Sequence, residues 1–214
     1  MSAQGTPAGR FITLEGGEGV GKSTQIRLLG LHLRSRGLEV VETREPGGTP
    51  GAEAIRALLL QGEADRWNPR AELLLFAAAR CDHVERLIRP ALARGAWVLC
   101  DRYVDSNRAY QAGASSVPDD DVMAAHDIGS AGLMPDRTIL LTAPAEEARR
   151  RAAERDAGRP DRIGARDQAF HDRVVAAFLD YAHAEPERFR VIDTSATPEE
   201  VGVRIAAAIS DLLP

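Results

Sequence analysis

The sequence predicts an α/β fold in which helices cover both faces of a five-stranded parallel sheet. Five short apolar runs, rich in β-branched residues, alternate with stretches long enough to form amphipathic helices. The runs are almost continuously apolar, which is typical of strands that are buried on both faces. At 214 residues the chain has the length of one such domain.

The order of the elements follows from these patterns. We expect strands at residues 10–15, 38–43, 97–101, 137–142 and 188–193. Ile26, Leu29 and Leu33 share one face of the first predicted helix. Longer helical patterns follow at residues 70–94, 165–183 and 198–213. The last of these helices has Thr197 as its expected N-cap and Pro198 in its first turn.

Composition and charge exclude several classes of protein. The chain is 44% hydrophobic and 28% charged, with a net charge of −5, so no overall positive field attracts nucleic-acid polymers or an anionic membrane. No apolar stretch reaches the roughly 18 residues that span a bilayer, and the N-terminus lacks the apolar core of a signal peptide. The two cysteines, Cys81 and Cys100, have no metal-ligand spacing. We expect a cytoplasmic protein with a flexible tail at 1–9 and one domain at 10–214.

A glycine-rich motif follows the first predicted strand. It matches GxxxxGK[ST] and leads into the first helix through Gly16, Gly17, Glu18, Gly19, Val20, Gly21, Lys22, Ser23 and Thr24. Glycines let successive backbone N–H groups point at a phosphate, and the helix N-terminus adds partial positive charge. Lys22 would bridge the outer phosphates, and Ser23 would ligate Mg²⁺. The alternative is a chance match on an ordinary turn.

The lysine of this motif is the only one in the chain, because 26 of the 27 basic residues are arginines. A compact ammonium fits between phosphate oxygens in a tight backbone cradle, whereas a planar guanidinium is too wide. The position of Lys22 inside the motif therefore favours phosphate binding over chance.

Asp101 and Arg102 stand at the end of the strand predicted at 97–101. Ligands of parallel sheets bind beyond the carboxyl ends of the strands, so Asp101 would emerge beside the glycine-rich loop. There it would hold Mg²⁺, usually through water. The alternative is a structural pair of Asp101 with Arg102 that caps the strand.

Two helical patterns suit a flat heterocycle. Phe76 and Arg80 lie four residues apart, so an aromatic plane for stacking and a guanidinium for hydrogen bonding share one face. Alone, this pair is more typical of a core phenylalanine beside a surface arginine. Asn107, Tyr110 and Gln111 are also spaced along one helix face, where they would recognise a base edge or line a solvated surface.

A turn-forming segment follows the second predicted strand. It contains Glu45 and Pro46, and its prolines and glycines turn the chain at the sheet edge that also carries the glycine-rich loop. Arg56 lies in the helix start that follows. The segment is either an ordinary loop or, given its place above the strand ends, part of a site.

Together these motifs resemble the thymidylate kinase family, in its bacterial form, over almost the whole chain after the N-terminal tail. The matching segments occur in family order as FITLEGGEGVGKST, REPGGTPGAEAIR, LLLFAAARCDH, DRYVDSNRAYQ and DTSATPEE. The resemblance implies a three-layer P-loop NTPase fold and a homodimer. It also implies a nucleoside monophosphate kinase that phosphorylates dTMP to dTDP, with ATP and Mg²⁺ as cofactors and only small-molecule nucleotides as substrates.

The resemblance implies roles at the phosphates. The loop from Gly16 to Ser23 would bind the ATP phosphates, with Lys22 at the transferring group. Glu18 would approach the sugar 3′-hydroxyl and the region of phosphoryl transfer. Arg56 and Arg102 would hold the phosphate of dTMP.

It also implies roles at the nucleoside. The residues expected there are Glu45, Pro46, Phe76, Arg80, Asn107, Tyr110 and Gln111. Phe76 would stack on thymine, and Arg80 would donate to its O4. Asn107 and Gln111 would address the pyrimidine edge, while Tyr110 would crowd the sugar 2′ position.

The chain departs from the family pattern at two places. Gly19 stands where some members carry an arginine that contacts the transferring group, so a lid near 154–166 would supply that charge on closure. The arginines available there are Arg155, Arg159 and Arg162. Residues 112–115 replace a glycine-rich segment that usually ends in arginine.

Two other functions stay open at this point. A nucleoside kinase, or another nucleotide kinase with the same loop, is one; an acceptor without a phosphate would leave Arg56 and Arg102 without a partner. A non-catalytic nucleotide-binding regulator is the other, and it would show no turnover with any monophosphate. The apolar residues of 73–92 would serve either a dimer interface or the core.

Overall fold

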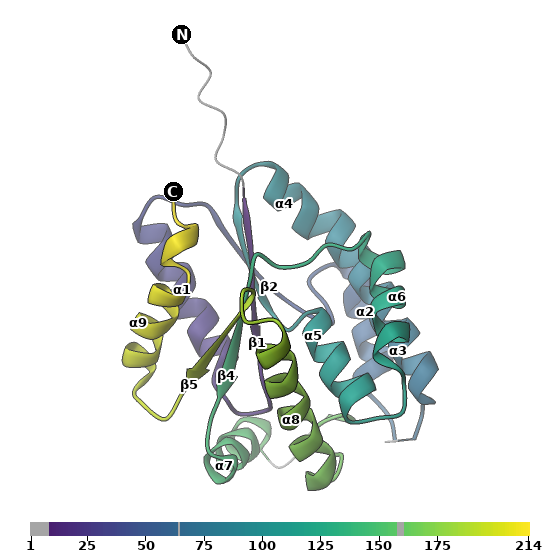
Figure 1. Cartoon of the computed structure of the whole chain (residues 1–214). Coiled ribbons are helices and arrows are strands. Elements are labelled where there is room, and N and C mark those ends of the chain that lie inside the picture. Colours follow the sequence, from purple (N-terminus) through teal and green to yellow (C-terminus); the bar gives the residue numbers. More distant parts are fainter. Residues whose placement is uncertain (1–8, 64, 158–160) are drawn as a thin grey trace.

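The protein is built around a parallel sheet with the strand order β2-β3-β1-β4-β5 (Figure 1). A computed structural model describes residues 9–63, 65–157 and 161–214 of the chain. The strands in this part are β1 (Arg10–Glu15), β2 (Val40–Arg44), β3 (Trp97–Asp101), β4 (Arg137–Thr142) and β5 (Phe189–Asp193). Every neighbouring pair is parallel, which confirms the predicted sheet. Because β1 is central, the loop after it starts at the middle of the carboxyl edge.

Two strands begin later than predicted, and in both cases a turn explains it. The backbone N–H of Leu38 donates to the carbonyl of Leu33 at the end of the first helix, so residue 38 belongs to a helix cap instead of a strand. The N–H of Arg188 likewise donates to the carbonyl of Glu185 in a turn. The other three strands have the predicted bounds.

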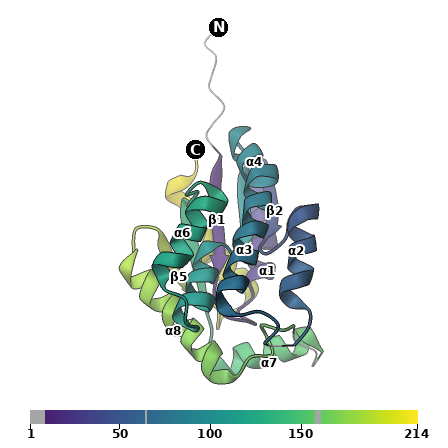
Figure 2. The same cartoon turned by 90° about the vertical axis from the view of Figure 1, so that its right-hand side faces the viewer.

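Helices lie on both sides of the sheet (Figure 1). One side carries α1 (Lys22–Ser35) and α9 (Pro198–Ala208). The other side carries α2 (Pro50–Leu60), α3 (Pro69–His83), α4 (Arg89–Ala93), α5 (Val104–Asn107), α6 (Asp119–Ser130) and α8 (Gln168–Ala184). The helix α7 (Ala145–Asp156) lies beyond the carboxyl ends of the strands. Figure 2 shows α3 between α2 and α6, and α3 packs against both.

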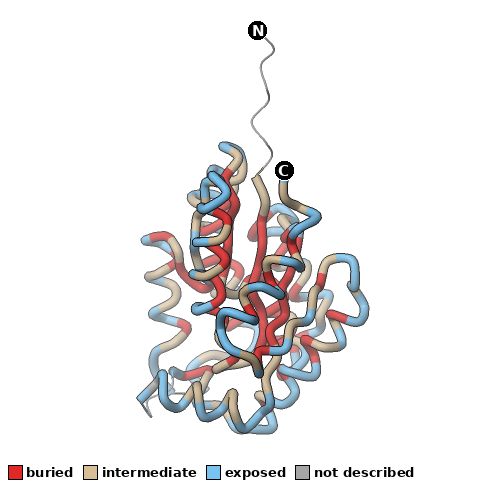
Figure 3. Tube along the Cα trace, turned by 90° about the vertical axis from the view of Figure 1, so that its left-hand side faces the viewer, coloured by how far each residue is buried: buried red, intermediate tan, exposed pale blue. Residues whose placement is uncertain are grey.

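The core divides into layers because successive strand residues point to opposite faces. Ile12 of β1 belongs to the cluster that includes Leu33 of α1 and Ile205 of α9. Its neighbour Phe11 belongs to the cluster on the other face, with Ile88. Figure 3 shows the buried residues concentrated along the strands and on the inward sides of the helices.

The long helix predicted at 70–94 is interrupted. It consists of α3, a π-helical turn at Val84–Ile88 and α4. Pro90 stands in the first turn of α4 and has no N–H to donate to the turn before it, and the change of pitch occurs there. Ile88 is fully buried, and Leu87 and Leu92 pack partly buried against the same cluster. Core packing therefore accounts for these apolar residues.

The C-terminal elements follow the prediction with shorter helices. The helix predicted at 165–183 is α8, and α9 ends at Ala208, followed by a 3₁₀ turn at Ser210–Leu212. Thr197 is the N-cap of α9 as predicted, and Glu200 completes a reciprocal capping box with it. Among the described helices, none is long and apolar enough to cross a membrane. Of the predicted tail, residues 1–8 lie outside the described residues.

Candidate active site at the carboxyl end of the sheet

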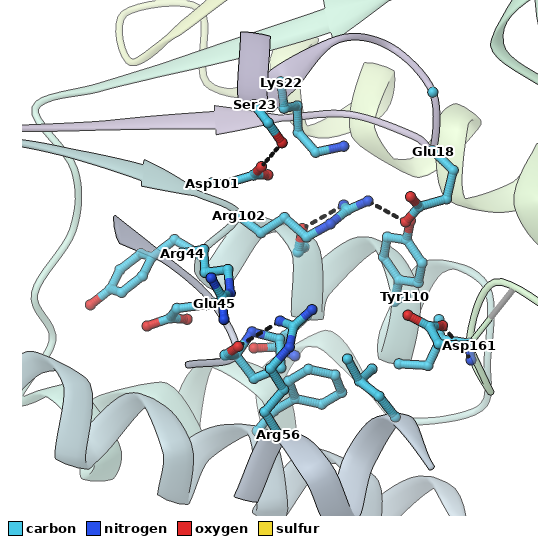
Figure 4. A pocket seen from close by; sticks show the side chains of 18 of the residues that line it. Glu18, Lys22, Ser23, Arg44, Glu45, Arg56, Asp101, Arg102, Tyr110 and Asp161 are labelled. Carbon is cyan, nitrogen blue, oxygen red and sulfur yellow. Dashed lines mark hydrogen bonds and ion pairs between the residues drawn. The ribbon is translucent and has the colours of Figure 1, made fainter. Parts of the chain in front are cut away.

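A cavity of about 590 Å³ opens at the carboxyl ends of β1, β2 and β3 (Figure 4). Most of the residues singled out in the sequence line it. They are Glu18, Gly19, Gly21, Lys22, Ser23, Thr24, Glu45, Pro46, Arg56, Phe76, Arg80, Asp101, Arg102, Asn107, Tyr110, Gln111 and Arg155. Gly16, Gly17 and Val20 line a second cavity on the other side of the glycine-rich loop. Arg159 lies outside the described residues.

The loop needs its glycines for backbone conformation and for space. Gly16, Gly19 and Gly21 have positive φ angles of 131°, 73° and 91°, which other residues rarely adopt. A Cβ on Gly19 would also stand 2.0 Å from the carbonyl oxygen of Ala148 in α7. The close approach of α7 explains why this chain carries glycine here, since neither the φ angle nor the available space suits a side chain.

The single lysine is buried over the loop that precedes it. Its Nζ donates to the carbonyl oxygens of Gly16 (3.2 Å) and Gly17 (2.7 Å). Burial, together with the nearby Arg102 guanidinium, lowers the pKa of Lys22 to about 8. The ammonium therefore lies in a place where additional negative charge would favour its protonated form.

Ser23 and Asp101 meet at the end of β3, as Figure 4 shows. The Ser23 hydroxyl donates to Asp101 Oδ2 at 2.9 Å, so the aspartate does emerge beside the loop. A hydroxyl and a carboxylate are the hard oxygen ligands that suit Mg²⁺. No group of three or more His, Cys, Asp or Glu side chains in the described part of the chain could hold a metal by itself, so phosphate and water oxygens would complete the coordination.

Arg102 pairs with Glu18 of the loop, not with its neighbour Asp101. Its Nη2 donates to Glu18 Oε1 at 2.6 Å, and its guanidinium lies 5.1 Å from the centre of the Tyr110 ring. Glu18 also pairs with Arg155 of α7 at 2.9 Å. Although burial opposes it, the positive charge of Arg102, Lys22 and Arg155 holds the pKa of Glu18 well below its usual value. The carboxylate is thus charged and shared between two arginines.

The backbone at Arg102 is strained, because its φ is 70° in a residue with a side chain. The next residue is fixed by Glu15, because the backbone N–H of Tyr103 donates to Glu15 Oε1 at 2.7 Å. Ser106 connects the same carboxyl group to the arginine, because its hydroxyl donates to Glu15 Oε2 at 2.6 Å and accepts from Arg102 Nη1 at 3.1 Å. Glu15 therefore supports the conformation that aims Arg102 into the cavity.

Arg80 is buried in one wall of the cavity, with 2% of its surface exposed. The alternative of a surface arginine beside a core phenylalanine is therefore wrong. Its Nε donates to Glu45 Oε2 at 2.8 Å, and Glu45 also contacts His83 Nδ1 at 3.1 Å. Phe76, one helical turn earlier, lines the same cavity. Burial opposes it, but Arg80 and His83 lower the pKa of Glu45, so this pair presents a fixed guanidinium.

Asn107 and Gln111 are also buried, with 2% and 1% of their surfaces exposed. The alternative of a solvated face is wrong for both. Asn107 accepts from Arg80 and donates to Gln111 at 2.8 Å. The two amides therefore continue the polar wall of the cavity that starts at Arg80. Phe76 and these buried polar groups thus line the same cavity as the glycine-rich loop.

Comparison with known proteins identifies the family of this chain. The family model for thymidylate kinase matches residues 14–205. This chain belongs to the thymidylate kinase family. The chain is 59% identical to thymidylate kinase of Rhizorhabdus wittichii over 206 residues, covering 96% of this chain and 99% of that protein. It is 50% identical to thymidylate kinase of Caulobacter vibrioides over 205 residues, covering 96% of each chain.

A solved structure confirms the fold of this family member. The crystal structure of thymidylate kinase from Ehrlichia chaffeensis matches with a TM-score of 0.77 and 29% identity. The match covers 95% of this chain and 100% of that one. The resemblance and the P-loop NTPase fold predicted from the sequence are therefore confirmed.

Two arginines that this thymidylate kinase family member was expected to use at the phosphates, Arg56 and Arg162, lie in different surroundings. Arg56 lines the cavity and donates to the Pro46 carbonyl at 2.7 Å. Arg162, one of the arginines expected in the lid near 154–166, is buried instead: it is 3% exposed, donates to the Leu59 carbonyl at 2.7 Å and pairs with Glu72. The guanidinium of Arg162 is thus bonded to Leu59 and Glu72, outside the lining of the cavity.

Sequence reasoning missed several polar residues of this site. They are Glu15, Arg44, Glu72, His83, Ser106 and Asp161. A signal existed for one of them, because the spacing that joins Phe76 to Arg80 extends one turn back to Glu72. Glu15 ends an apolar strand and gave no comparable signal. In the segment 112–115, which departs from the family pattern, Ser115 accepts from Arg166 at 3.3 Å.

Proposed function

We propose that this chain transfers the γ-phosphoryl group of ATP to dTMP, giving dTDP and ADP, in the cavity at the carboxyl ends of β1, β2 and β3. Phosphorylation of thymidylate is the activity after which its relatives are named. The observation that carries the proposal is that the glycine-rich loop and the buried slot of Phe76 and Arg80 line one and the same cavity. A nucleotide donor and a pyrimidine acceptor would then meet inside it.

The donor side would be held by the loop. Its backbone N–H groups would bind the ATP phosphates, and Lys22 would leave the carbonyls of Gly16 and Gly17 for the phosphate oxygens. Ser23 and Asp101 would hold Mg²⁺ together with phosphate oxygens and water. When bound, the metal would neutralise negative charge on the phosphates.

The acceptor side would be held by the arginines. The phosphate of dTMP would take Arg102, which now pairs with Glu18, and would also contact Arg56. Its second pKa is about 6, so the attacking oxygen is already ionised at neutral pH and the chain needs no general base. Catalysis would consist of positioning and charge stabilisation, with Arg155 near Glu18 supplying positive charge at the transferring group.

The base would lie in the slot. Phe76 would stack on thymine and Arg80, a donor-only group, would bond to the O4 acceptor. Asn107 and Gln111 would address the remaining pyrimidine edge, and Tyr110 would lie against the sugar. Cytosine carries an amino donor at position 4, which would face the guanidinium of Arg80 without an acceptor between them.

Several further features belong to this proposal. Residues 10–214 would act as one kinase domain in the cytoplasm, with 154–166 as its lid, although residues 158–160 lie outside the described residues. A homodimer would form through the outer surface of α3 and α6, where Leu74 is 63% exposed and Ile128 is 87% exposed. Light scattering coupled to size-exclusion chromatography would give the mass of that assembly.

A panel of acceptors with ATP and Mg²⁺ tests the activity. In an assay coupled to ADP release, dTMP should react fastest, and dUMP should follow with a loss of roughly 10–200-fold in kcat/KM for the missing methyl group. We expect dCMP, dAMP and dGMP to react far more slowly than dUMP. Thymidine, which lacks the phosphate, separates this activity from that of a nucleoside kinase. Faster turnover of dCMP than of dUMP would contradict the slot, and added EDTA should stop all turnover.

A further inference from the structure

A chain of four buried polar side chains connects α3 with the segment 104–113, and three of them, Arg80, Asn107 and Gln111, line one wall of the cavity. Arg80 Nη2 donates to Asn107 Oδ1, Asn107 Nδ2 donates to Gln111 Oε1 at 2.8 Å, and Gln111 Nε2 donates to Glu72 Oε1 at 2.8 Å. Each of the four is at most 2% exposed. Both end members, Arg80 and Glu72, come from α3, two turns apart.

The two ends of this chain fix the direction of every hydrogen bond within it. A guanidinium only donates and a carboxylate only accepts. Asn107 must therefore turn its carbonyl to Arg80, and Gln111 must turn its amide nitrogen to Glu72. The bond between the two amides then has one possible direction. Turning either amide over would place two donors or two acceptors against each other inside the protein, where an unpaired polar group is costly.

Glu72 is itself held on both oxygens. Arg162 pairs with its Oε2, and Arg166 Nη2 lies 3.1 Å from Oε1 and 3.0 Å from Oε2. Arg80, at the other end, is held by Glu45 at 2.8 Å. Both ends of the chain are thus anchored by charged partners, so the amides between them take their orientation from the protein and need no substrate to set it.

We propose that Glu72 is the positioning residue that sets which nucleobase this cavity accepts, by fixing the orientation of the Gln111 and Asn107 amides. The inference rests on the proposed function, because it requires a pyrimidine at the polar wall that these amides form. An amide that turns over exchanges a donor for an acceptor at the same position. Thymine carries an acceptor at position 4 and a donor at position 3, and cytosine carries the reverse pattern. The orientation of the amides therefore distinguishes one base from the other.

Glu72→Gln tests this directly. Arg162 and Arg166 would compete for the one remaining carbonyl oxygen, so the new amide nitrogen would face Gln111 and favour the turned orientation of that side chain. The turned Gln111 would then present its nitrogen to Asn107 Nδ2, which breaks the bond between the two amides and releases the fixed pattern of donors and acceptors. We expect the ratio of kcat/KM for dTMP to that for dCMP to fall by at least about tenfold. Because both substrates are measured on the same preparation, this ratio does not depend on how much of the variant is folded.

A second variant covers a loss of folding. Glu72→Gln combined with Arg162→Met also removes the buried guanidinium whose ion pair with Glu72 the single change breaks, while Arg166 still holds the new carbonyl. It should show the same fall in the ratio. Glu72→Asp keeps a group that only accepts, so its ratio should stay within about threefold of the wild type even where KM for dTMP rises. Asp211→Asn is the matched control: it breaks the ion pair with the buried Arg137 (2.7 Å) at the opposite end of β4 and should leave the ratio unchanged.

The outcomes separate the inference from the function it rests on. A wild-type ratio in both variants that carry Glu72→Gln would overturn the inference, since Glu72 would then serve only stability. A wild-type enzyme that phosphorylates neither dTMP nor dUMP would overturn the proposed function, and the inference with it. An equal fall in the ratio for Asp211→Asn would also overturn the inference, because any broken ion pair would then have the same effect.

Discussion

The backbone around Lys22 suits a lysine side chain and no other residue type. It is buried in a backbone cradle with only carbonyl oxygens as hydrogen-bond acceptors, so its protonated form gains most when phosphate oxygens arrive. We expect Lys22→Ala to lower kcat by about 10²–10³-fold, the loss typical of one preorganised donor at the reacting group. Steady-state kinetics at saturating dTMP would measure it. Lys22→Arg should not restore the rate, because the planar group is too wide for the cradle; wild-type turnover in either variant would refute the role.

Glu15 carries a pH effect on stability. Burial, with the charge of Asp105 nearby, raises the pKa of Glu15 to about 8. In the unfolded chain the same group ionises near pH 4.5, so between about pH 4.5 and 8 the folded protein binds more protons than the unfolded one. This contribution to stability is therefore complete below that window and is lost as pH rises through it.

Glu15→Gln should remove that dependence, since an amide oxygen still accepts from the Tyr103 N–H but does not titrate. Urea denaturation at pH 5, 6, 7 and 8 would give the free energy of unfolding of both proteins. We expect the difference between variant and wild type to grow in favour of the variant as pH rises. Glu63→Gln, at an exposed position, serves as the control. Parallel pH profiles for wild type and Glu15→Gln would show that the carboxyl is not the titrating group.

At the residue scale, sequence reasoning found groups with a motif around them and missed those defined by burial alone. The loop, Asp101 and Arg102 were predicted because a strand end and a glycine pattern fix where they emerge. Glu15 and Glu72 were missed because their partners are distant in the sequence: Glu72 bonds to Gln111 and Arg162, 39 and 90 residues away. No local pattern encodes such a pairing.

At the scale of elements, α9 offers a direct test of local encoding. Thr197 Oγ1 accepts from the backbone N–H of Glu200, and Glu200 Oε2 accepts from the backbone N–H of Thr197. Thr197→Ala removes the acceptor of the Glu200 N–H, so that helix donor loses its protein partner, and the change should lower the free energy of unfolding by about 1 kcal/mol. Urea denaturation would measure it. As a control, Ser35→Ala at the exposed end of α1 should change the free energy of unfolding by less than about 0.5 kcal/mol. A loss as large as that of Thr197→Ala would show that the capping box contributes no more to stability than an ordinary exposed hydroxyl.

Element boundaries were predicted well where a cap or a strand end has a chemical signature, and poorly where the backbone changes pitch. Thr197 marks the start of α9, and the strand at 97–101 ends at its first acidic residue. The π-helical turns at Val84–Ile88 and Arg108–Gly113 keep the apolar spacing of a helix, so periodicity alone gave no indication of them. The second of these turns carries Gln111 and so shapes the polar wall of the cavity.

At the scale of the whole molecule, the site is a product of strand order. Placing β1 between β3 and β4, and β3 beside β2, brings the ends of three strands and their loops to one edge. Alternating strands and helices predicted a parallel sheet and a shared edge for these loops, but that pattern is the same for many strand orders, so the order β2-β3-β1-β4-β5 follows only from tertiary packing. Once they meet, these residues line one cavity, with the proposed phosphate end at the glycine-rich loop and the proposed base end at Phe76 and Arg80.

Because both ends belong to one folded unit, each nucleotide should stabilise the whole protein through its own end. At a concentration of 100 times Kd, a ligand that binds only the folded state adds about 2.7 kcal/mol, which for a chain of this size raises Tm by roughly 5–10 °C. We expect ATP with Mg²⁺ to produce such a shift, dTMP to produce one of similar size, and EDTA to reduce the first but not the second. Differential scanning fluorimetry would record both. Lys22→Ala should lose most of the shift with ATP and keep the shift with dTMP, and Arg80→Ala should do the reverse; a variant that loses both shifts together would contradict two separable ends of the cavity.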